Sequence, residues 1–449
     1  MSYFILMIIL FVLGYAFIAL EHPLKINKSA SALLLAVVLW SVFALFGDGF
    51  EHSEIISHLG ETAEIVFFLL GAMTIVEIID SHQGFKIITE KINTTNKRKL
   101  LWIISILTFF MSAVLDNLTT AIVMCALLRK LIGDKHDRWF FCGMVILAAN
   151  SGGAWSPIGD VTTIMLWIKG NVTAMKIILE TFIPSLVSML VPLTIITFVL
   201  KGEVKRPEAI AKSNHDIQIS TKQSNLIFFL GVGSLLFVPV FKTITHLPPY
   251  LGIFLGLGVL WVVTEIMHKS NSNNYSKLNV PAVLSKIDMS SILFFVGILM
   301  AVACLQTAGH LDLLSKSLDK IGNIYIINIL IGMISAIVDN VPLVAAAIGM
   351  YPVATPEMIE VNPELYHFAV DGAFWEFLAY CAGTGGSLLI IGSAAGVAVM
   401  GMEKIDFIWY LKKISLWALL GYLAGAGVFV IISKFILHTY TILLNINVG

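Results

Sequence analysis

Apolar runs long enough to cross a lipid bilayer recur along the chain, and they limit what it can fold into. A bilayer core takes about 20 helical residues to cross. Only 13% of the 449 residues are charged, against about 25% in a soluble domain, and the mean hydropathy is +0.90. The composition therefore predicts an all-α polytopic membrane protein. The apolar runs cover residues 3–20, 29–46, 63–80, 176–200, 225–241, 250–267, 290–308 and 408–437.

The basic residues predict how the chain is oriented in the membrane. Lys and Arg concentrate in short loops on the cytoplasmic side, and 22 of the 28 fall in one set of loops between the apolar runs. The segments 47–62 and 351–370 carry acidic residues and neither Lys nor Arg. We therefore expect these two segments and both chain termini on the outer (periplasmic) side. The first run has neither a basic start nor a cleavage site, which is typical of a retained helix.

A short acidic motif occurs twice. The string "SAVLDNLTTAIVM" at 112–124 places Asp116 inside an apolar run, and "SAIVDNVPLVAAAIGM" at 335–350 does the same with Asp339. Two further pairs follow the same order, "FFLLGAMTIVE" with "FFVGILMAVAC" and "SGGAWSPIG" with "TGGSLLIIG". Three matches in one order predict an internal duplication. The expected division is a first repeat over 1–200, a cytoplasmic linker over 201–224 and a second repeat over 225–449.

Counting crossings predicts that the second copy is inverted. Basic residues flank the first acidic motif on both sides, so that block enters and leaves on one face and adds an even number of crossings. Each half then crosses five or seven times. An odd number of crossings makes the second copy start on the opposite face, so it is inverted. The arm 118–131 reaches at most roughly 20 Å as a helix, too short to span comfortably. This favours re-entrant hairpins over 99–131 and 322–351, whose tips are Asp116 with Asn117 and Asp339 with Asn340.

The glycine-containing blocks predict a broken membrane helix in each half, over 139–170 and 371–401. In the first, a helix that starts near Trp139 should stop at 150–153. Ser156 followed by Pro157 is the pattern of an N-cap and a first helical position, so a second half-helix should begin there. Unwound backbone at membrane depth lines a cavity or is buried in protein. Its free carbonyls and half-helix ends are therefore candidate ligands.

Carboxylates at these breaks are the strongest candidates for function. A charged side chain at the bilayer centre costs about 3 kcal/mol on insertion scales and usually marks a functional site. The competing interpretation is that each carboxyl is neutral and caps a helix. Neutral oxygen donors cluster at the same breaks, although singly such residues more often hydrogen-bond within a helix. The candidate set is Asp116, Asn117, Asn150, Ser151, Asp160, Thr163, Asp339, Asn340 and Thr384. Asp371 and Glu376, at the outer start of the second broken helix, are weaker candidates for attracting cations.

The donor chemistry favours a small monovalent cation as cargo. Hard oxygen ligands suit Na⁺ or Li⁺ better than soft metals, and the four cysteines lack the spacing of a metal site or disulfide framework. Removing a carboxylate from water favours its protonated form, so an ion and a proton can compete for it. That competition predicts antiport of cytoplasmic Na⁺ or Li⁺ against external protons. We expect no enzyme activity, cofactor or nucleic-acid partner.

The sequence resembles the NhaD-type sodium/proton antiporters of the ion transporter superfamily over nearly the whole chain. The resemblance is carried by the two acidic motifs and by "NSGGAWSPIGDVTTIMLW" and "GTGGSLLIIGSAAGVAVMGMEKIDFIWY". The resemblance implies a bacterial inner-membrane or plastid-envelope exporter, a homodimer, and a cation site where each hairpin tip meets the broken helix of its own half. Asp160 aligns with Ser393, so the tighter site is expected in the first half. Two alternatives stay open: a dicarboxylate or arsenite transporter of the same superfamily, and, more remotely, an intramembrane aspartyl protease suggested by Gly159-Asp160.

Overall fold

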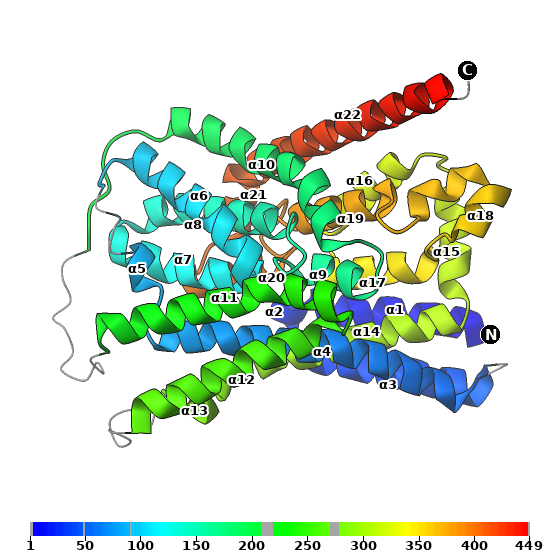
Figure 1. Cartoon of the computed structure of the whole chain (residues 1–449), viewed down its shortest axis with the longest axis horizontal. Coiled ribbons are helices and arrows are strands. Elements are labelled where there is room, and N and C mark those ends of the chain that lie inside the picture. The colour runs from blue at the N-terminus through cyan, green and yellow to red at the C-terminus, as the bar shows by residue number, and fades with distance from the viewer. Residues whose placement is uncertain are drawn as a thin grey trace. The chain divides into compact units, whose positions relative to one another are not determined.

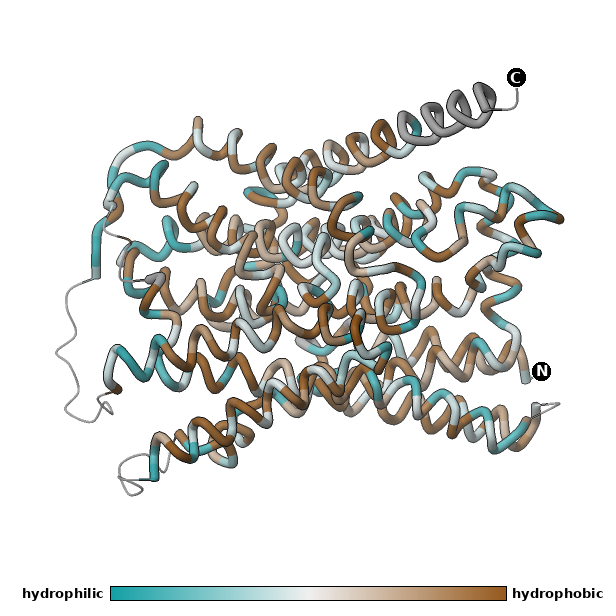
Figure 2. The backbone as a smooth tube through the Cα atoms, viewed as in Figure 1, coloured by the Kyte–Doolittle hydropathy of each residue, from teal (hydrophilic) through white to brown (hydrophobic). Residues whose placement is uncertain are grey.

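Every regular element in the described part of the chain is a helix. The computed structural model describes residues 3–47, 50–89, 92, 94–207, 219–269 and 278–447. Within these ranges, eight helices are long and apolar enough to cross a membrane. Figure 2 shows hydrophobic residues along the middle of the long helices and hydrophilic residues near their ends. The prediction of an all-α polytopic membrane protein is confirmed.

The chain divides into two compact units, each of which draws on both halves of the sequence. The first combines Met1–Asn93, Glu208–Ser317 and Ala345–Met350. In it, α3 packs against α1 and α14, and α4 packs against α11, α12 and α14. Its helices are α1 (Tyr3–Ala19), α2 (Glu21–Leu24), α3 (Lys28–Phe46), α4 (His52–Ser81), α5 (Lys86–Thr89), α11 (Thr221–Thr245), α12 (Pro249–His268), α13 (Val280–Leu284), α14 (Met289–Thr307) and most of α15 (His310–Asp319). The acidic segment 47–62, expected to be an outer loop, is largely helical because α4 begins at His52.

The second unit combines Thr94–Pro207, Leu318–Val344 and Tyr351–Gly449. In it, α6 packs against α8, α16 against α19, α10 against α22, and α7 against both α8 and α20. Figure 1 shows α6, α7 and α8 on the left and α16 and α19 on the right. Its elements are α6 (Lys97–Leu115), α7 (Asn117–Leu131), α8 (Lys135–Gly153), α9 (Val161–Ile168), α10 (Ala174–Val199), α16 (Ile324–Ile334), the first turn of α17 (Asn340–Met350), α18 (Pro356–Val361), the 3₁₀ helix η2 (Pro363–Phe368), α19 (Ala373–Gly385), α20 (Ala394–Glu403), α21 (Phe407–Lys413) and α22 (Ser415–Asn447).

Both predicted hairpins are present, with the acidic motifs at their tips. A single residue, Asp116, separates α6 from α7 and has a backbone φ of 69°, which a residue with a Cβ rarely adopts. Its carboxylate accepts hydrogen bonds from the backbone N–H and the hydroxyl of Thr119, both at 2.8 Å. These bonds cap α7 and help to hold the strained turn. At the second tip, the chain turns between the end of α16 and Asn340.

Equivalent contacts in the two halves support the duplication independently of the strings that predicted it. The hydroxyl of Ser112 on α6 donates to the carbonyl of Ala149 on α8, at 2.6 Å. The corresponding Ser335, just after α16, donates to the carbonyl of Gly332 at 2.7 Å and lies 3.3 Å from the carbonyl of Ala382 on α19. In both halves, the serine that opens the motif therefore lies against the broken helix of its own half.

Glycine allows the same close crossing in both halves. A Cβ on Gly152 would overlap the carbonyl oxygen of Phe109, and one on Gly385 would overlap that of Gly332. Because the obstructing atoms are backbone, they cannot move aside as a flexible side chain can. Gly152 and Gly385 are therefore required for the first half of each broken helix to lie directly against its hairpin.

Gly385→Ala should destabilise the protein by roughly 1–3 kcal/mol, since the added methyl group forces α19 and α16 apart. The control is Gly401→Ala in α20, where an added Cβ has no neighbour within 4 Å and the better helix propensity of Ala should help. Thermal unfolding of the purified protein in detergent gives the comparison. Equal unfolding midpoints for the two variants would show that the close crossing does not constrain the fold.

Candidate ion-binding site

The first broken helix places Asp160 at the start of its second half. α8 ends at Gly153, and α9 begins at Val161 with Asp160 as its N-cap. The expectation that Ser156 caps this half-helix was wrong. The Ser156 hydroxyl instead donates to the carbonyl of Ala113 at 2.5 Å, so it ties the unwound segment to the hairpin while the chain continues through turns to Asp160.

Asp160 is buried, with 1% of its surface exposed, and both carboxylate oxygens accept hydrogen bonds. Oδ1 accepts from the backbone N–H and the hydroxyl of Thr162, both at 2.9 Å. Oδ2 accepts from the side-chain amide of Asn117 at 2.7 Å. An ionised carboxylate only accepts hydrogen bonds, so these donors suit its charged form. The cap and the candidate ion ligand are the same side chain.

A chain of buried amides and hydroxyls joins the hairpin tip to both broken helices. The amide nitrogen of Asn117 also donates to Asn150 Oδ1, at 3.1 Å. The amide nitrogen of Asn150 donates in turn to the hydroxyls of Ser387 and Ser393, each at 2.9 Å. Ser387 and Ser393 flank the unwound segment between α19 and α20. Asp160 is therefore connected through two side chains to the break of the other half.

The two tip aspartates act electrostatically on the same carboxylate. Asp116 and Asp339 both lie close enough to Asp160 for their charges to interact with it, and both are partly exposed. Neighbouring carboxylates repel each other when all are ionised, and either a proton or a bound cation relieves that repulsion. The arrangement is therefore suited to holding a positive charge.

Two further predicted residues of the first half lie beside this network but direct their hydroxyls elsewhere. Thr163 donates to the backbone carbonyl of Asp160, at 2.8 Å, as helical threonines commonly do. Ser151 donates to the hydroxyl of Ser188 on α10, at 3.4 Å. As ligands, both would present oxygen lone pairs while keeping these bonds.

The second half provides a different environment. Asp339 Oδ1 accepts from the backbone N–H of Val341, at 3.2 Å, and Thr384 donates to the carbonyl of Tyr380, at 2.6 Å. Asn340 is buried, and its amide nitrogen has no hydrogen-bond partner among the described residues. Ser393 caps α20, as Asp160 caps α9, so a neutral side chain occupies the position of the buried carboxylate.

Sequence reasoning missed a second charged cluster, at the far end of α20. The Glu403 carboxylate, 1% exposed, lies 2.6 Å from Nε of Arg129 on α7 and 2.6 Å from Nε of Arg138 on α8. The indole of Trp139 donates to the Glu403 carbonyl at 3.1 Å. The cluster fastens the second broken helix to the first hairpin and to the first broken helix.

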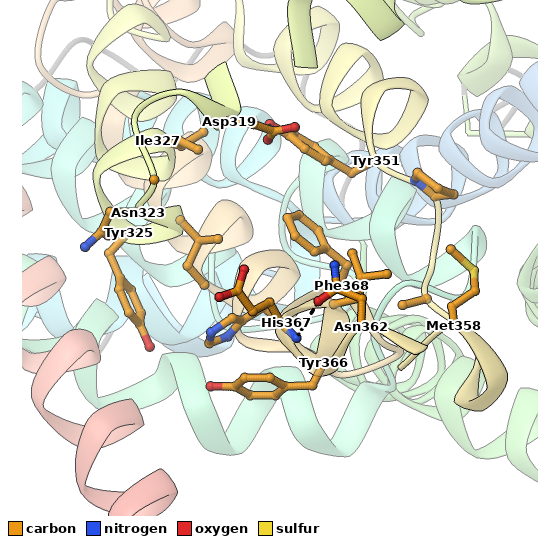
Figure 3. A pocket seen from close by; sticks show the side chains of 16 residues that line it. Asp319, Asn323, Tyr325, Ile327, Tyr351, Met358, Asn362, Tyr366, His367 and Phe368 are labelled. Atoms are coloured by element: carbon orange, nitrogen blue, oxygen red, sulfur yellow. Dashed lines mark hydrogen bonds between the residues drawn. The ribbon is translucent and has the colours of Figure 1, made fainter. Parts of the chain in front are cut away.

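A separate cavity of about 560 Å³ lies where the chain runs from the start of α16 past α18 and η2. Figure 3 shows aromatic side chains on its wall, including Tyr325, Tyr366 and Phe368. Asp319, also on the wall, accepts a hydrogen bond from the Tyr351 hydroxyl at 3.0 Å. Its lining includes none of the predicted ion-site residues, so the cavity is distinct from the network around Asp160.

Hairpins and broken helices that meet at a buried polar centre define the class of protein, a secondary transporter. The family described as "Citrate transporter" matches residues 8–370. The chain is 48% identical to sodium/proton antiporter 1 of Arabidopsis thaliana, covering 94% of this chain and 71% of that protein. It is 31% identical to the Na(+)/H(+) antiporter NhaD of Alkalimonas amylolytica, covering 96% and 91%. The chain belongs to the NhaD-type sodium/proton antiporter family, whose members are transporters and not enzymes.

A solved structure shows the same fold. The chain resembles the YdaH transporter of Alcanivorax borkumensis with a TM-score of 0.58 and 10% sequence identity, over 91% of this chain and 98% of that one. At this identity the likeness concerns the fold alone. The structural description of that transporter names an unusual topology.

Proposed function

We propose that the protein exports cytoplasmic Na⁺ in exchange for external protons, with the ion and the proton competing for buried aspartates at the membrane midplane. The observation that carries this proposal is the position of Asp160, buried at a helix break beside Asp116 and Asp339. When the site faces the cytoplasm, Na⁺ displaces the proton. When it faces outward, a proton displaces Na⁺, so each direction of movement carries one kind of cation.

The donor set supports Na⁺, with Li⁺ as a second cargo. Carboxylate, amide and hydroxyl oxygens are hard ligands and suit small hard cations. We assign the tighter site to Asp116, Asn117, Asn150, Ser151, Asp160 and Thr163, and a weaker second site to Asp339, Asn340 and Thr384. The asymmetry rests on the pairing of Asp160 with Ser393 at equivalent caps.

The location of the protein is part of this proposal and is supported by the relatives and by the basic loops. Its bacterial relatives are named Na(+)/H(+) antiporters, which favours a bacterial inner (plasma) membrane. The Lys and Arg distribution favours a cytoplasmic linker over 201–224 and both termini outside. The two inverted repeats, over 1–200 and 225–449, and a homodimeric assembly are further parts of this proposal.

A second candidate is transport of a citrate-like carboxylate, because that is how the matching family is described. Its difficulty is electrostatic. A dianionic cargo would have to approach Asp116, Asp160 and Asp339 in a dehydrated site, where like charges repel strongly. The aspartates would all need to be neutral, whereas a cation is attracted to them directly.

The proposal is tested in everted membrane vesicles that contain a preformed proton gradient reported by a quenched fluorescent dye. Addition of NaCl should release the gradient and restore fluorescence, and LiCl should do the same. Matched vesicles without the protein supply the background. If NaCl has no effect and recovery requires succinate or citrate, the carboxylate transporter is the correct assignment and sodium/proton exchange is not.

A further inference from the structure

A buried carboxyl outside the ion-binding network has no evident structural role. Glu376 lies in the first turn of α19 and is 4% exposed. Its Oε1 is buried and has no hydrogen-bond partner among the described residues. Burying a polar atom without a partner is costly. A carboxylate suits the first turn of a helix, but a shorter or exposed side chain would give that benefit without this cost, so the buried carboxyl calls for a functional explanation.

The helix that carries Glu376 leads directly to Asp160. Gly383 follows Glu376 by seven residues, so the two share a face of α19. A Cβ on Gly383 would lie 3.8 Å from Asp160 Oδ2. Seven helical residues rise about 10 Å. Glu376 therefore lies about two helical turns from Asp160, on the face of α19 that is next to Asp160.

The charged groups that act on Glu376 lie at the same end of the unit. They are Glu180, Lys176 and Asp371. Lys176 and Glu180 form an ion pair on α10 with an N–O distance of 2.6 Å, and α10 packs against α19. Asp371, two residues before α19, is partly exposed and accepts from the backbone and the hydroxyl of Thr173. These groups form a polar cluster beside the acidic segment 351–370, which the charge pattern predicts to lie on the outer side.

A row of buried hydroxyls on α10 runs from this polar cluster towards the helix break. Thr181, Ser185 and Ser188 are spaced by four and three residues, so they share one face of the helix, and all three are buried. The Thr181 hydroxyl donates to the carbonyl of Ile177 at 2.5 Å and lies 3.4 Å from the carbonyl of Ala154, and Ser188 accepts from Ser151. The Ser185 hydroxyl has no hydrogen-bond partner in the described part of the chain. The row connects the level of Glu376 with the unwound segment of the first broken helix.

We propose that Glu376 is an internal proton carrier, which takes up a proton from the outer solution and passes it along the α10–α19 interface to Asp160. The proposal rests on the proposed sodium/proton exchange. The transfer is balanced: protonated Glu376 loses one proton, and the Asp160 carboxylate gains it as Na⁺ departs outward. Hydroxyls and water relay the proton over the intervening distance. Sodium itself need not pass Glu376.

Two assays on Glu376→Gln in proteoliposomes test whether protons pass Glu376 while sodium does not. Na⁺/H⁺ exchange should slow by at least about tenfold, since a positioned acid–base group typically contributes more than this to a proton transfer. Exchange of radioactive sodium against unlabelled sodium needs no proton and should stay at the wild-type rate. Glu376→Asp should recover part of the Na⁺/H⁺ rate. Glu357→Gln, an exposed carboxyl in the first turn of α18, is the matched control and should behave as wild type.

Other results overturn the inference. A Glu376→Gln variant with wild-type Na⁺/H⁺ exchange would show that the carboxyl carries no proton. A variant that loses both exchange reactions would show a role in folding or in sodium binding instead. Asp160→Asn in the same assays distinguishes the two proposals: if it exchanges both ions normally, the proposed ion site is wrong whatever Glu376 does. If only Asp160→Asn fails, the ion site stands and the proton route does not.

Discussion

Asp160→Asn should abolish sodium-driven proton release, leaving only the signal of vesicles that lack the protein. Asparagine is as good an N-cap as aspartate, and its side-chain oxygen can still accept from Thr162, so α9 should begin at the same residue. What the substitution removes is the negative charge, and with it both the attraction for Na⁺ and the group that binds the proton. The measurement is fluorescence recovery in everted vesicles after NaCl addition, normalised to the amount of protein.

The matched control is Asp406→Asn, at the exposed N-cap of α21, where the aspartate accepts from the backbone N–H of Trp409 at 2.8 Å. It makes the same chemical change at a helix start outside the site and should exchange sodium normally.

Asp339→Asn should retain partial activity, because its half has Ser393 at the equivalent cap. Intact exchange in Asp160→Asn together with complete loss in Asp339→Asn would move the principal site to the second half.

The elements that position the site were predictable because each leaves a local signal in the sequence. Asp116 and Asp339 stand out since a charge in an apolar run has few explanations at membrane depth. Paired glycines followed by polar residues mark a helix break for a similar reason, because a broken backbone must be buried in protein or line a cavity. These signals correctly indicated both hairpins, their tips and both broken helices.

The tertiary hydrogen bonds of the site could not be predicted in the same way. Ser156 and Pro157 carry the local pattern of a helix start, but a tertiary hydrogen bond to Ala113 engages the Ser156 hydroxyl and the helix begins later. The bonds from Asn150 to Ser387 and Ser393 join the two halves, whereas matching repeats directs attention to contacts within one half. Such contacts depend on how helices pack, and no local pattern reports that.

Glu403→Ala should lower the stability of the protein by about 3 kcal/mol, a typical cost of breaking a buried ion pair from one side. The Glu403 side chain is 1% exposed and pairs with both Arg138 and Arg129, so removal of this one buried carboxylate takes the counter-charge from two guanidinium groups. Arg129, at 47% exposure, can turn outward and contributes less. A lower thermal unfolding midpoint in detergent is the expected result.

The comparison for Glu403→Ala is Asp137→Ala, which breaks an ion pair with Lys97 of similar length, 2.7 Å, between α8 and α6. That pair is partly exposed on both sides, at 17% and 23%, and water can replace it, so its loss should cost about 1 kcal/mol or less. Equal losses for the two variants would mean that burial does not strengthen the Glu403 cluster. A larger loss for Glu403→Ala would make the cluster a principal link between the broken helix of the second half and the hairpin that carries Asp116, because one carboxylate there holds arginines from both α7 and α8.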